Sequence, residues 1–378
     1  MKKFFALVLA LVMALSLTTV AWGAGVDCSA GCSDPTNHVA AVGNNHYTDL
    51  QEAIKDAAPS GTVEILKDVT VGTWVMFSQT KTIGNGQIIT LNMDGLTING
   101  NGHTLTVNNV ESANNGGYLF DNAKNLNIYN LTIKMNCNAG GIDLESGTID
   151  TVTFEGGNCI FPDGGAITVN NCTFNTDGYV IYYETARDGL VVTNNTFNVD
   201  PAKNVMILYG GETFTGNTVT SGRTVNIVSN TATVSGNTFN TRVKLYKEGQ
   251  ELTGNSFGAA AYIDIEDGIN SVDVSGNFWG GGAPSATQIP TAIADKVKVD
   301  TYATTNNNGV LGGLVDPNAP PAPTPTVPVY PYYPPVVEDT TDKDVTSAQT
   351  FDAGIALYVG VSVLGAAGTV ALSKKRED

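Results

Sequence analysis

Charged residues are scarce in this chain, and basic residues are the scarcest of them. Charged residues make up 15% of its 378 residues, against about a quarter in typical globular proteins. The chain has 19 lysines and arginines but 36 aspartates and glutamates, which gives a formal net charge of −17. A protein without a basic patch cannot release counterions from phosphates, which argues against nucleic acid binding. Polyanionic sugars would also be repelled unless cations bridge the two surfaces.

Cysteine and histidine are rare too, with five and three residues in the whole chain. Cys28 and Cys32 are separated by three residues, and His38 and His46 follow them. Two interpretations remain open. In a secreted chain the two cysteines would form a local disulfide, whereas together with the histidines they would bind zinc, although the spacing matches no standard zinc finger. We expect the remaining cysteines to pack inside as small apolar residues; they are Cys137, Cys159 and Cys172.

A short phrase recurs between residues 153 and 279 at a spacing near twenty residues. Its copies read Asn-Cys-Thr, Asn-Asn-Thr, Gly-Asn-Thr, Gly-Asn-Ser or Gly-Asn-Phe, followed by a large apolar residue. Such a period is typical of a solenoid, in which each repeat buries its apolar face against its neighbours. The large apolar residues are therefore expected to stack in the interior; the series is Phe154, Phe174, Phe197, Val219, Phe239, Phe257 and Trp279.

The repeats lack the stripe of apolar residues that a helix would show. They contain short alternating runs instead, such as Val205-x-Ile207 and Val225-x-Ile227, and this period of two predicts half-buried strands. The register turns Met206 outward. Gly-Asn pairs between the strands tolerate the left-handed backbone of a tight corner. The sequence therefore predicts a parallel β-helix with a buried amide ladder, formed by Asn217, Asn237, Asn255 and Asn277.

Two segments resemble the right-handed parallel β-helix proteins of the pectin-lyase-like superfamily. Residues 91–105, Leu-Asn-Met-Asp-Gly-Leu-Thr-Ile-Asn-Gly-Asn-Gly-His-Thr-Leu, are similar to the opening coils of these proteins. Residues 275–281, Ser-Gly-Asn-Phe-Trp-Gly-Gly, are similar to the phrase that often closes them. The resemblance covers about residues 45–305 and implies an all-β, right-handed parallel β-helix solenoid. It implies no single activity, because the superfamily includes lyases, hydrolases, epimerases and adhesins.

Both ends of the chain are expected to serve secretion and attachment. Lys2 and Lys3 precede an uncharged apolar run, as in a secretory signal peptide. Residues 353–372 carry no charge and are long enough for a transmembrane helix, and the basic residues that follow place the C-terminus in the cytoplasm. The predicted order is signal peptide (1–23), N-terminal cap region (24–61), parallel β-helix (62–315), proline-rich and acidic spacer (316–350), transmembrane anchor (351–373) and basic cytoplasmic tail (374–378).

The spacer and the anchor together are similar to the layout of Gram-positive surface proteins. Residues 317–335 contain nine prolines, which favours an extended polyproline spacer. In that layout a sortase cuts an L-P-x-T-G signal ahead of the apolar helix. Residues 347–351, Ser-Ala-Gln-Thr-Phe, keep only the threonine of this signal. We therefore favour a retained anchor at the extracellular face of the cell membrane, with a variant cell-wall sorting signal as the alternative.

A short helix is expected to close the N-terminal end of the solenoid. Thr48 and Gln51 have the spacing of a capping box, which predicts a helix start. The end of a solenoid needs a polar cover. The face turned toward the first coil would consist of Leu50, Ala53, Ile54 and Ala57.

The longest step of the repeat contains a first candidate site. Residues 182–188 read Tyr-Tyr-Glu-Thr-Ala-Arg-Asp, and we expect them to project as a loop. Glu184, Arg187 and Asp188 are weak catalytic candidates, since they could bind a uronate and exchange a proton. Tyr183 could stack on a sugar ring. The alternative is a solvated turn between strands.

Asp143 and Glu145 form a second candidate site. They flank Leu144 and would point outward beside each other on one strand. Paired carboxylates can serve glycoside hydrolysis or bind Ca²⁺, and surface charges in contact with solvent are the alternative.

No catalytic signature of the resembled superfamily is complete. Asn175-Thr-Asp177 matches the first element of the polygalacturonases, but their paired acidic motif, G-H-G and R-I-K do not follow. We therefore predict a membrane-tethered surface module, without catalysis, that contacts glycans, the cell envelope or a host surface. The alternative is a surface-attached polysaccharide lyase or epimerase.

Overall fold

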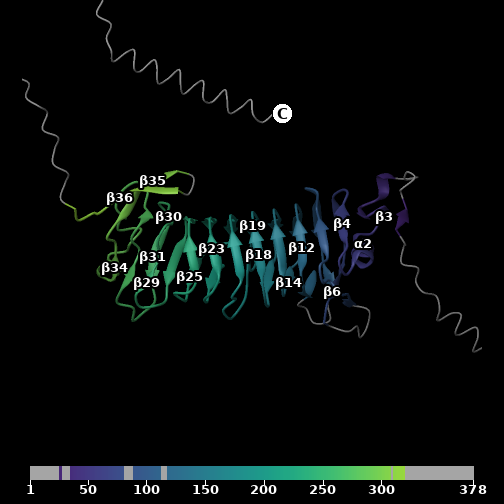
Figure 1. Ribbon diagram of the computed structural model, residues 1–378, viewed down its shortest axis with the longest axis horizontal. Coiled ribbons are helices and arrows are strands. Elements are labelled where there is room, and N and C mark those ends of the chain that lie inside the picture. The colour runs from purple at the N-terminus through teal and green to yellow at the C-terminus, as the bar shows by residue number, and fades with distance from the viewer. Residues whose placement is uncertain (1–24, 28–34, 81–87, 112–116, 308–309, 320–378) are drawn as a thin grey trace, which may run out of the picture. The chain divides into compact units, whose positions relative to one another are not determined.

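The computed structural model describes residues 25–27, 35–80, 88–111, 117–307 and 310–319. This part of the chain is a parallel β-solenoid, in which strands of successive coils pair side by side along the stack (Figure 1). The expectation of an all-β parallel solenoid is confirmed. The predicted signal peptide, membrane anchor and tail, and the spacer from residue 320 onward, lie outside the described residues.

Two long sheets form two sides of the solenoid. The first sheet has 11 described strands: β1 (Val26–Asp27), β2 (Ala40–Val42), β3 (Asn45–Tyr47), β4 (Thr62–Ile65), β8 (Thr97–Asn99), β12 (Leu126–Tyr129), β15 (Gly147–Asp150), β18 (Ile167–Asn170), β20 (Leu190–Thr193), β23 (Thr213–Thr215) and β26 (Thr233–Ser235). The second sheet has 12: β5 (Val69–Val71), β9 (Thr104–Val107), β13 (Thr132–Met135), β16 (Thr153–Glu155), β19 (Thr173–Thr176), β21 (Thr196–Val199), β24 (Thr218–Ser221), β27 (Thr238–Phe239), β30 (Ser256–Phe257), β33 (Asn277–Phe278), β35 (Tyr302–Asn307) and β36 (Val310–Val315).

The third side is divided between shorter sheets. One contains β6 (Trp74–Ser78), β7 (Ile88–Thr90), β10 (Val110–Glu111), β11 (Phe120–Ala123), β14 (Ile142–Leu144) and β17 (Ile160–Pro162), and another contains β22 (Met206–Leu208), β25 (Thr224–Ile227), β28 (Arg242–Leu245) and β31 (Tyr262–Ile265). A small sheet near the C-terminal end holds β29 (Gln250–Glu251), β32 (Val272–Asp273) and β34 (Val297–Lys298). The helical elements are η1 (Pro35–Asn37), α2 (Leu50–Ala57) and η2 (Ala294–Lys296).

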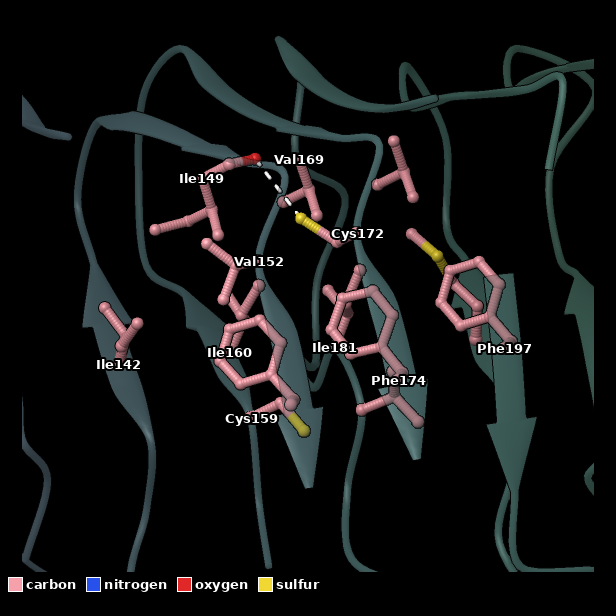
Figure 2. Packing of buried hydrophobic residues seen from close by; sticks show 14 of the residues in the cluster. Ile142, Ile149, Val152, Cys159, Ile160, Val169, Cys172, Phe174, Ile181 and Phe197 are labelled. Carbon is pink, nitrogen blue, oxygen red and sulfur yellow. Dashed lines mark hydrogen bonds between the residues drawn. The ribbon is translucent and has the colours of Figure 1, made fainter. Parts of the chain in front are cut away.

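The large apolar residues of the repeat form one interior row, as predicted. On the second sheet Phe154, Phe174 and Phe197 pair in register, and the row continues through Val219 to Phe239 and Phe257. The rings of Phe174 and Phe197 lie 5.0 Å apart and nearly parallel (Figure 2). Each such pair adds roughly 0.5–1.5 kcal/mol to the gain from burial. Stacking in this row therefore fixes the register of one coil on the next.

Val219 interrupts the aromatic row, and a residue from the opposite sheet fills the space. Phe214 on β23 is fully buried, and its ring lies 5.7 Å from that of Phe197 and 6.4 Å from that of Phe239. A smaller side chain on one sheet is thus matched by a larger one from the same coil on the other, which keeps the interior closely packed.

One register on the third side differs from the prediction. Met206, rather than Val205, pairs with Val225, and Met206 is buried. The expectation that Met206 faces outward is wrong. Val205 and Met206 are both apolar and both buried, so the pattern of alternation could not distinguish them.

The predicted amide ladder exists and begins one coil earlier than expected. The Oδ1 atom of each asparagine accepts hydrogen bonds from the coil before it: that of Asn217 accepts from the backbone N–H of Asn195 (2.9 Å) and from its Nδ2 (3.0 Å). The same two contacts join Asn217 to Asn237 and Asn237 to Asn255, while Asn277 accepts from the backbone N–H of Asn255. All five side chains are buried. The ladder therefore satisfies backbone groups that the corners leave unpaired inside the solenoid.

The corner before this ladder adopts the left-handed conformation in coil after coil. Its φ values lie between +51° and +72° at Asn130, Thr151, Asn171, Asn194, Gly216, Gly236, Gly254 and Gly276. Asparagine tolerates this region and glycine occupies it without steric cost, whereas a β-branched residue there is strained. Thr151, with φ +56°, is therefore the strained member of the series.

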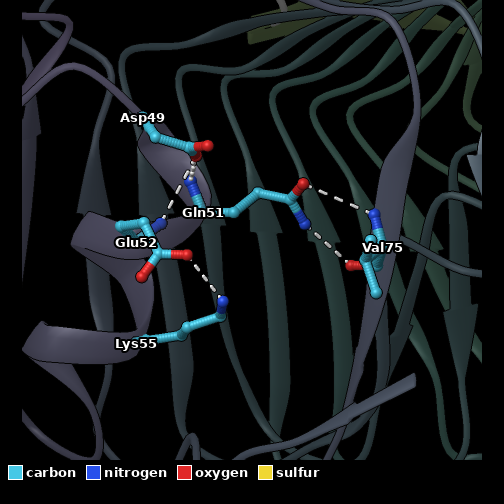
Figure 3. A network of polar contacts seen from close by, with 5 residues as sticks. All are labelled: Asp49, Gln51, Glu52, Lys55 and Val75. Carbon is cyan, nitrogen blue, oxygen red and sulfur yellow. Dashed lines mark hydrogen bonds and ion pairs between the residues drawn. The ribbon is translucent and has the colours of Figure 1, made fainter. Parts of the chain in front are cut away.

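Helix α2 covers the first coil, as predicted, but its N-cap is Asp49. The Asp49 carboxylate accepts from the backbone N–H groups of Gln51 and Glu52 (Figure 3). The expected capping box is therefore wrong, because Gln51 uses its amide to bridge the backbone N–H and C=O of Val75. The predicted apolar face is confirmed; Leu50, Ala53, Ile54 and Ala57 are all buried.

We expect Asn237→Ala to destabilise the fold strongly. The change removes the acceptor of two hydrogen bonds from Asn217 and the donor to the carbonyl of Phe214. Leaving buried polar groups unpaired costs about 1–3 kcal/mol each, so the free energy of unfolding should fall by about 3–5 kcal/mol. Urea denaturation measures this. Asn175→Ala, at an exposed position on β19, is the control and should stay within about 0.5 kcal/mol; equal losses in the two variants would contradict a structural role for the ladder.

Replacing Thr151 should have the opposite effect. Thr151→Gly relieves the left-handed strain of a β-branched residue, which costs roughly 1–2 kcal/mol. Against this gain, it loses the hydrogen bond from Oγ1 to Asp150 and makes the unfolded chain more flexible. Thr151→Asn does not make the unfolded chain more flexible in the way that glycine does, so we expect it to raise the free energy of unfolding by about 0.5–1 kcal/mol. It should also melt at a higher temperature than Thr151→Gly. A lower melting temperature for Thr151→Asn than for the natural protein would show that the corner is not strained.

Candidate functional site

The long step of the repeat lies on the third side of the solenoid, between β17 and β22. On this side, the coil between those of β17 and β22 has a single β-bridge in place of a strand, and the bridge pairs Ile181 with Ile160. Ile181 continues the buried row of Phe120, Ile142 and Ile160. Side chains alternate along the strand, so that Tyr182 continues the outward row in which Asp143 pairs with Phe161. Asp143 and Tyr182, which come from the two candidate groups of the sequence, therefore lie on one face.

Four aromatic rings are in contact along this face, and we call them the aromatic strip. The ring of Phe161 lies 5.1 Å from that of Tyr118 and 6.0 Å from that of Tyr182. Tyr179 lies 4.6 Å from Tyr182 and is 46% exposed. Lys203 Nζ lies 5.1 Å from the centre of the Tyr179 ring. The outer rings of the strip are thus available to a ligand that lies on the surface.

Carboxylates and one arginine surround the aromatic strip. The Tyr182 hydroxyl donates to Glu184 Oε1 (2.7 Å), and this bond, with some burial, raises the pKa of Tyr182 to about 12. Arg187 forms an ion pair with Asp163 at 3.2 Å. Burial, followed by the charges of Asp143 and other aspartates, raises the pKa of Tyr118. Tyr118 and Tyr182 therefore remain neutral donors at physiological pH.

Tyr183 does not belong to the exposed surface. It is 5% exposed, and its ring packs 5.7 Å from that of Tyr209 inside the solenoid. Burial, with the nearby charge of Glu212, raises the pKa of its hydroxyl. Tyr183, which we expected to stack on a sugar, is therefore turned inward, whereas alternation along the strand turns Tyr182 outward.

A buried carboxylate that the sequence analysis missed holds the loop in place. Glu212 is fully buried and accepts three backbone hydrogen bonds, from Arg187 (3.1 Å), Tyr209 (3.3 Å) and Gly210 (2.6 Å). Asp188, the third catalytic candidate, lies against Gly211. Any larger residue at position 211 would place its Cβ atom 1.9 Å from Asp188 Oδ1, which is too close. Glu212 therefore joins the 182–188 loop to the next coil, and the glycine pair before it was its only signal in the sequence.

The other acidic candidates, Asp143 and Glu145, have different surroundings. Asp143 lies on β14 opposite Phe161, whereas Glu145 follows the end of that strand and forms an ion pair with Lys124 at 3.1 Å. Among the described residues, no group of three or more histidines, cysteines, aspartates or glutamates is placed to hold a metal ion. Asp143 is thus associated with the aromatic strip, and Glu145 with a basic neighbour.

The N-terminal candidates are only partly described. Cys28 and Cys32 lie outside the described residues, so that their disulfide and zinc interpretations stay predictions. His38 and His46 contact each other edge to face, with ring centres 5.2 Å apart. Cys159 and Cys172 are buried free thiols (Figure 2), and burial raises the pKa of both to about 12. Their expected packing is confirmed, while Cys137 is only half-buried.

The hollows of the surface differ in what they can bind. Beside the aromatic strip lies a hollow of about 60 Å³, far below the roughly 300–1,000 Å³ of typical ligand pockets. Two larger grooves, of about 630 and 420 Å³, follow the corner between the two long sheets. Amides and hydroxyls line these grooves together with Leu131 and Val310, and no described lining residue is charged or aromatic. The strip therefore offers the better site, as an open surface rather than a closed pocket.

No protein-family model, curated protein or solved structure matches this chain in comparisons with known proteins. Among the described residues, no helix is long and apolar enough to cross a membrane. The expected anchor at residues 353–372 lies outside them.

We expect Glu212→Gln to loosen the loop that carries Arg187 and Asp188. The three backbone N–H groups now share the two carboxylate oxygens of Glu212, whereas a glutamine amide has a single acceptor oxygen. Hydrogen bonds to charged groups contribute about 1.5–3 kcal/mol. The free energy of unfolding should fall by about 2–3 kcal/mol, and the amide of Arg187 should exchange its hydrogen faster. Glu184→Gln, at an exposed position, should leave both unchanged. Unaltered exchange at Arg187 in Glu212→Gln would contradict this role.

Proposed function

We propose that this chain is a membrane-tethered cell-surface β-solenoid that binds carbohydrate without chemical turnover. Its resemblance to the pectin-lyase-like superfamily supports a right-handed coil, and its expected signal, spacer and anchor support display outside the cell. The observation that carries the proposal is the aromatic strip. Sugar rings present apolar C–H faces, which pack on exposed aromatic rings in the same way as other apolar surfaces.

The charges around the strip favour a neutral glycan. Asp143, Asp163 and Glu184 are carboxylates, and Arg187 is already paired with Asp163. Among the described residues around the strip, Lys203 is the other cation, so that a polyuronate would meet mainly negative charge and repulsion opposes its binding. This differs from the uronate that the 182–188 sequence first indicated. Hydroxyl groups of a neutral sugar can instead bond to the carboxylates and to the tyrosine hydroxyls.

A shallow, open strip also favours binding over catalysis. Lyases and epimerases remove a proton with a positioned base within reach of the substrate. The best-placed carboxylate, Glu184, already accepts a hydrogen bond from the Tyr182 hydroxyl, and the hollow beside it is small. The arrangement supports a surface that holds a polymer along several rings.

The test is binding of neutral polysaccharides and of polyuronates by the full chain, with a glycan array and calorimetry. We expect neutral glycans to bind, and Tyr182→Ala to weaken binding about tenfold, which corresponds to roughly 1.4 kcal/mol for a lost stacking contact. Tyr129→Ala, on β12 of another side, should bind as the natural protein does.

Equal affinity for neutral glycans in Tyr182→Ala and Tyr129→Ala would contradict the proposal that the aromatic strip binds the glycan. Release of unsaturated or epimerised products from uronate polymers would favour the lyase or epimerase alternative.

A further inference from the structure

The two ends of the solenoid are protected to very different degrees. At the N-terminal end, the first long sheet finishes in β1, a strand of two residues that carries Asp27, and helix α2 packs nearby. Short strands and charges are the usual means of preventing a sheet edge from pairing with another chain. The second long sheet finishes in β36, which has six residues and no charge. Among the described residues β35 is its only strand partner.

β36 also concentrates exposed apolar side chains. Val310 is 72% exposed and Leu314 is 64% exposed, and Val315 is exposed as well. Across the described residues only three other large apolar residues are comparably exposed, and they are scattered at Val26, Leu66 and Tyr179. An uncharged edge strand with clustered apolar residues is a template for another strand.

The sequence of β36 reads the same in both directions. It is Val-Leu-Gly-Gly-Leu-Val from Val310 to Val315. In a symmetric dimer the same patch meets itself, so that residue i contacts j and j contacts i. If two copies of β36 pair antiparallel about an axis between Gly312 and Gly313, valine meets valine, leucine meets leucine and glycine meets glycine. No bulky residue then faces a smaller one, and no like charges meet.

The backbone of β36 keeps one ladder register on both sides of Gly313. Val310, Leu311, Gly312, Leu314 and Val315 pair with β35 in that register, and Gly313 is the one residue of the strand without a place in it. In an antiparallel ladder alternate residues turn their N–H and C=O groups away from the partner. Gly313, with φ +65°, leaves the extended conformation, and the same register resumes at Leu314.

The chain that follows β36 is poorly suited to cover this edge. Nine prolines lie in residues 317–335, and proline has no N–H to donate to a ladder. A second copy of the chain has a matching uncharged strand.

We propose that β36 is the interface of a homodimer, in which two copies of the chain join by antiparallel pairing of their β36 strands. The second sheets of the two copies then form one continuous sheet across the two-fold axis.

The experiment measures the mass of the full chain, kept soluble in detergent, by sedimentation. We expect a dimer. Val310→Lys places a positive charge opposite Val315 of the other copy, and Val315→Glu places a negative charge opposite Val310 of the other copy. Each change alone should weaken dimerisation at least tenfold. The double variant places lysine opposite glutamate twice and should restore the dimer. Leu66→Lys, at an exposed apolar residue away from β36, should remain dimeric.

Three results would overturn the proposal. The first is that the natural chain is monomeric at roughly 10 μM. A monomer that binds an added strand-forming peptide would overturn the proposal too, because the partner of β36 would then not be a second copy. The second is a dimer that Val310→Lys leaves intact, which would place the contact elsewhere. The third is failure of the double variant to restore the dimer, provided that circular dichroism shows all variants folded.

Discussion

The hydrogen bonds that join one coil to the next at the corner between the two long sheets hold this structure together. A corner must turn the chain sharply, so its backbone groups cannot all pair within the sheets. In the C-terminal half, buried asparagines supply the missing partners, and each side chain bonds the backbone of the preceding coil. In the preceding coils Cys172, Val152 and Leu131 occupy the corresponding position, and the residue before each of them is asparagine or threonine rather than glycine. The two arrangements meet at Asn194-Asn195. Asn194 is a non-glycine corner residue, as in the earlier coils, and Asn195 is a buried asparagine of the ladder, as in the later coils.

Because two sheets and their corner fix the stacking, the third side is free to vary. Its strands fall into separate sheets, and at Ile181 pairing is reduced to one bridge. The interruption makes room for the 182–188 loop and exposes Tyr179 and Tyr182. The same loop would be unstable without a partner for its backbone N–H groups, and Glu212 provides it from the next coil. The irregular side of the solenoid is thus where a surface for ligands can form.

The parts that could be predicted from the sequence are those that repeat. The aromatic row was predictable because Phe174, Phe197 and Phe239 recur at one place in each copy. Asn195 was missed since its copy contains two adjacent asparagines, and the pattern does not say which one turns inward. Thr48 and Asp49 raised the same difficulty at the start of α2, as both are good N-caps. Glu212 could not be predicted from its neighbours alone, because one of its three N–H donors, that of Arg187, lies in a different coil.

The architecture also separates stability from recognition. In a solenoid each coil contacts mainly its neighbours, so that a change in one coil affects the next and little beyond it. The aromatic strip draws its rings from different coils, at Tyr118, Phe161 and Tyr182. None of these rings takes part in the buried row of Phe174 and Phe197 or in the asparagine ladder. Substitutions in the strip can therefore change the ligand while the buried row and ladder keep the coils in register. Changes at the ladder, in contrast, would disturb every side of the coils that they join.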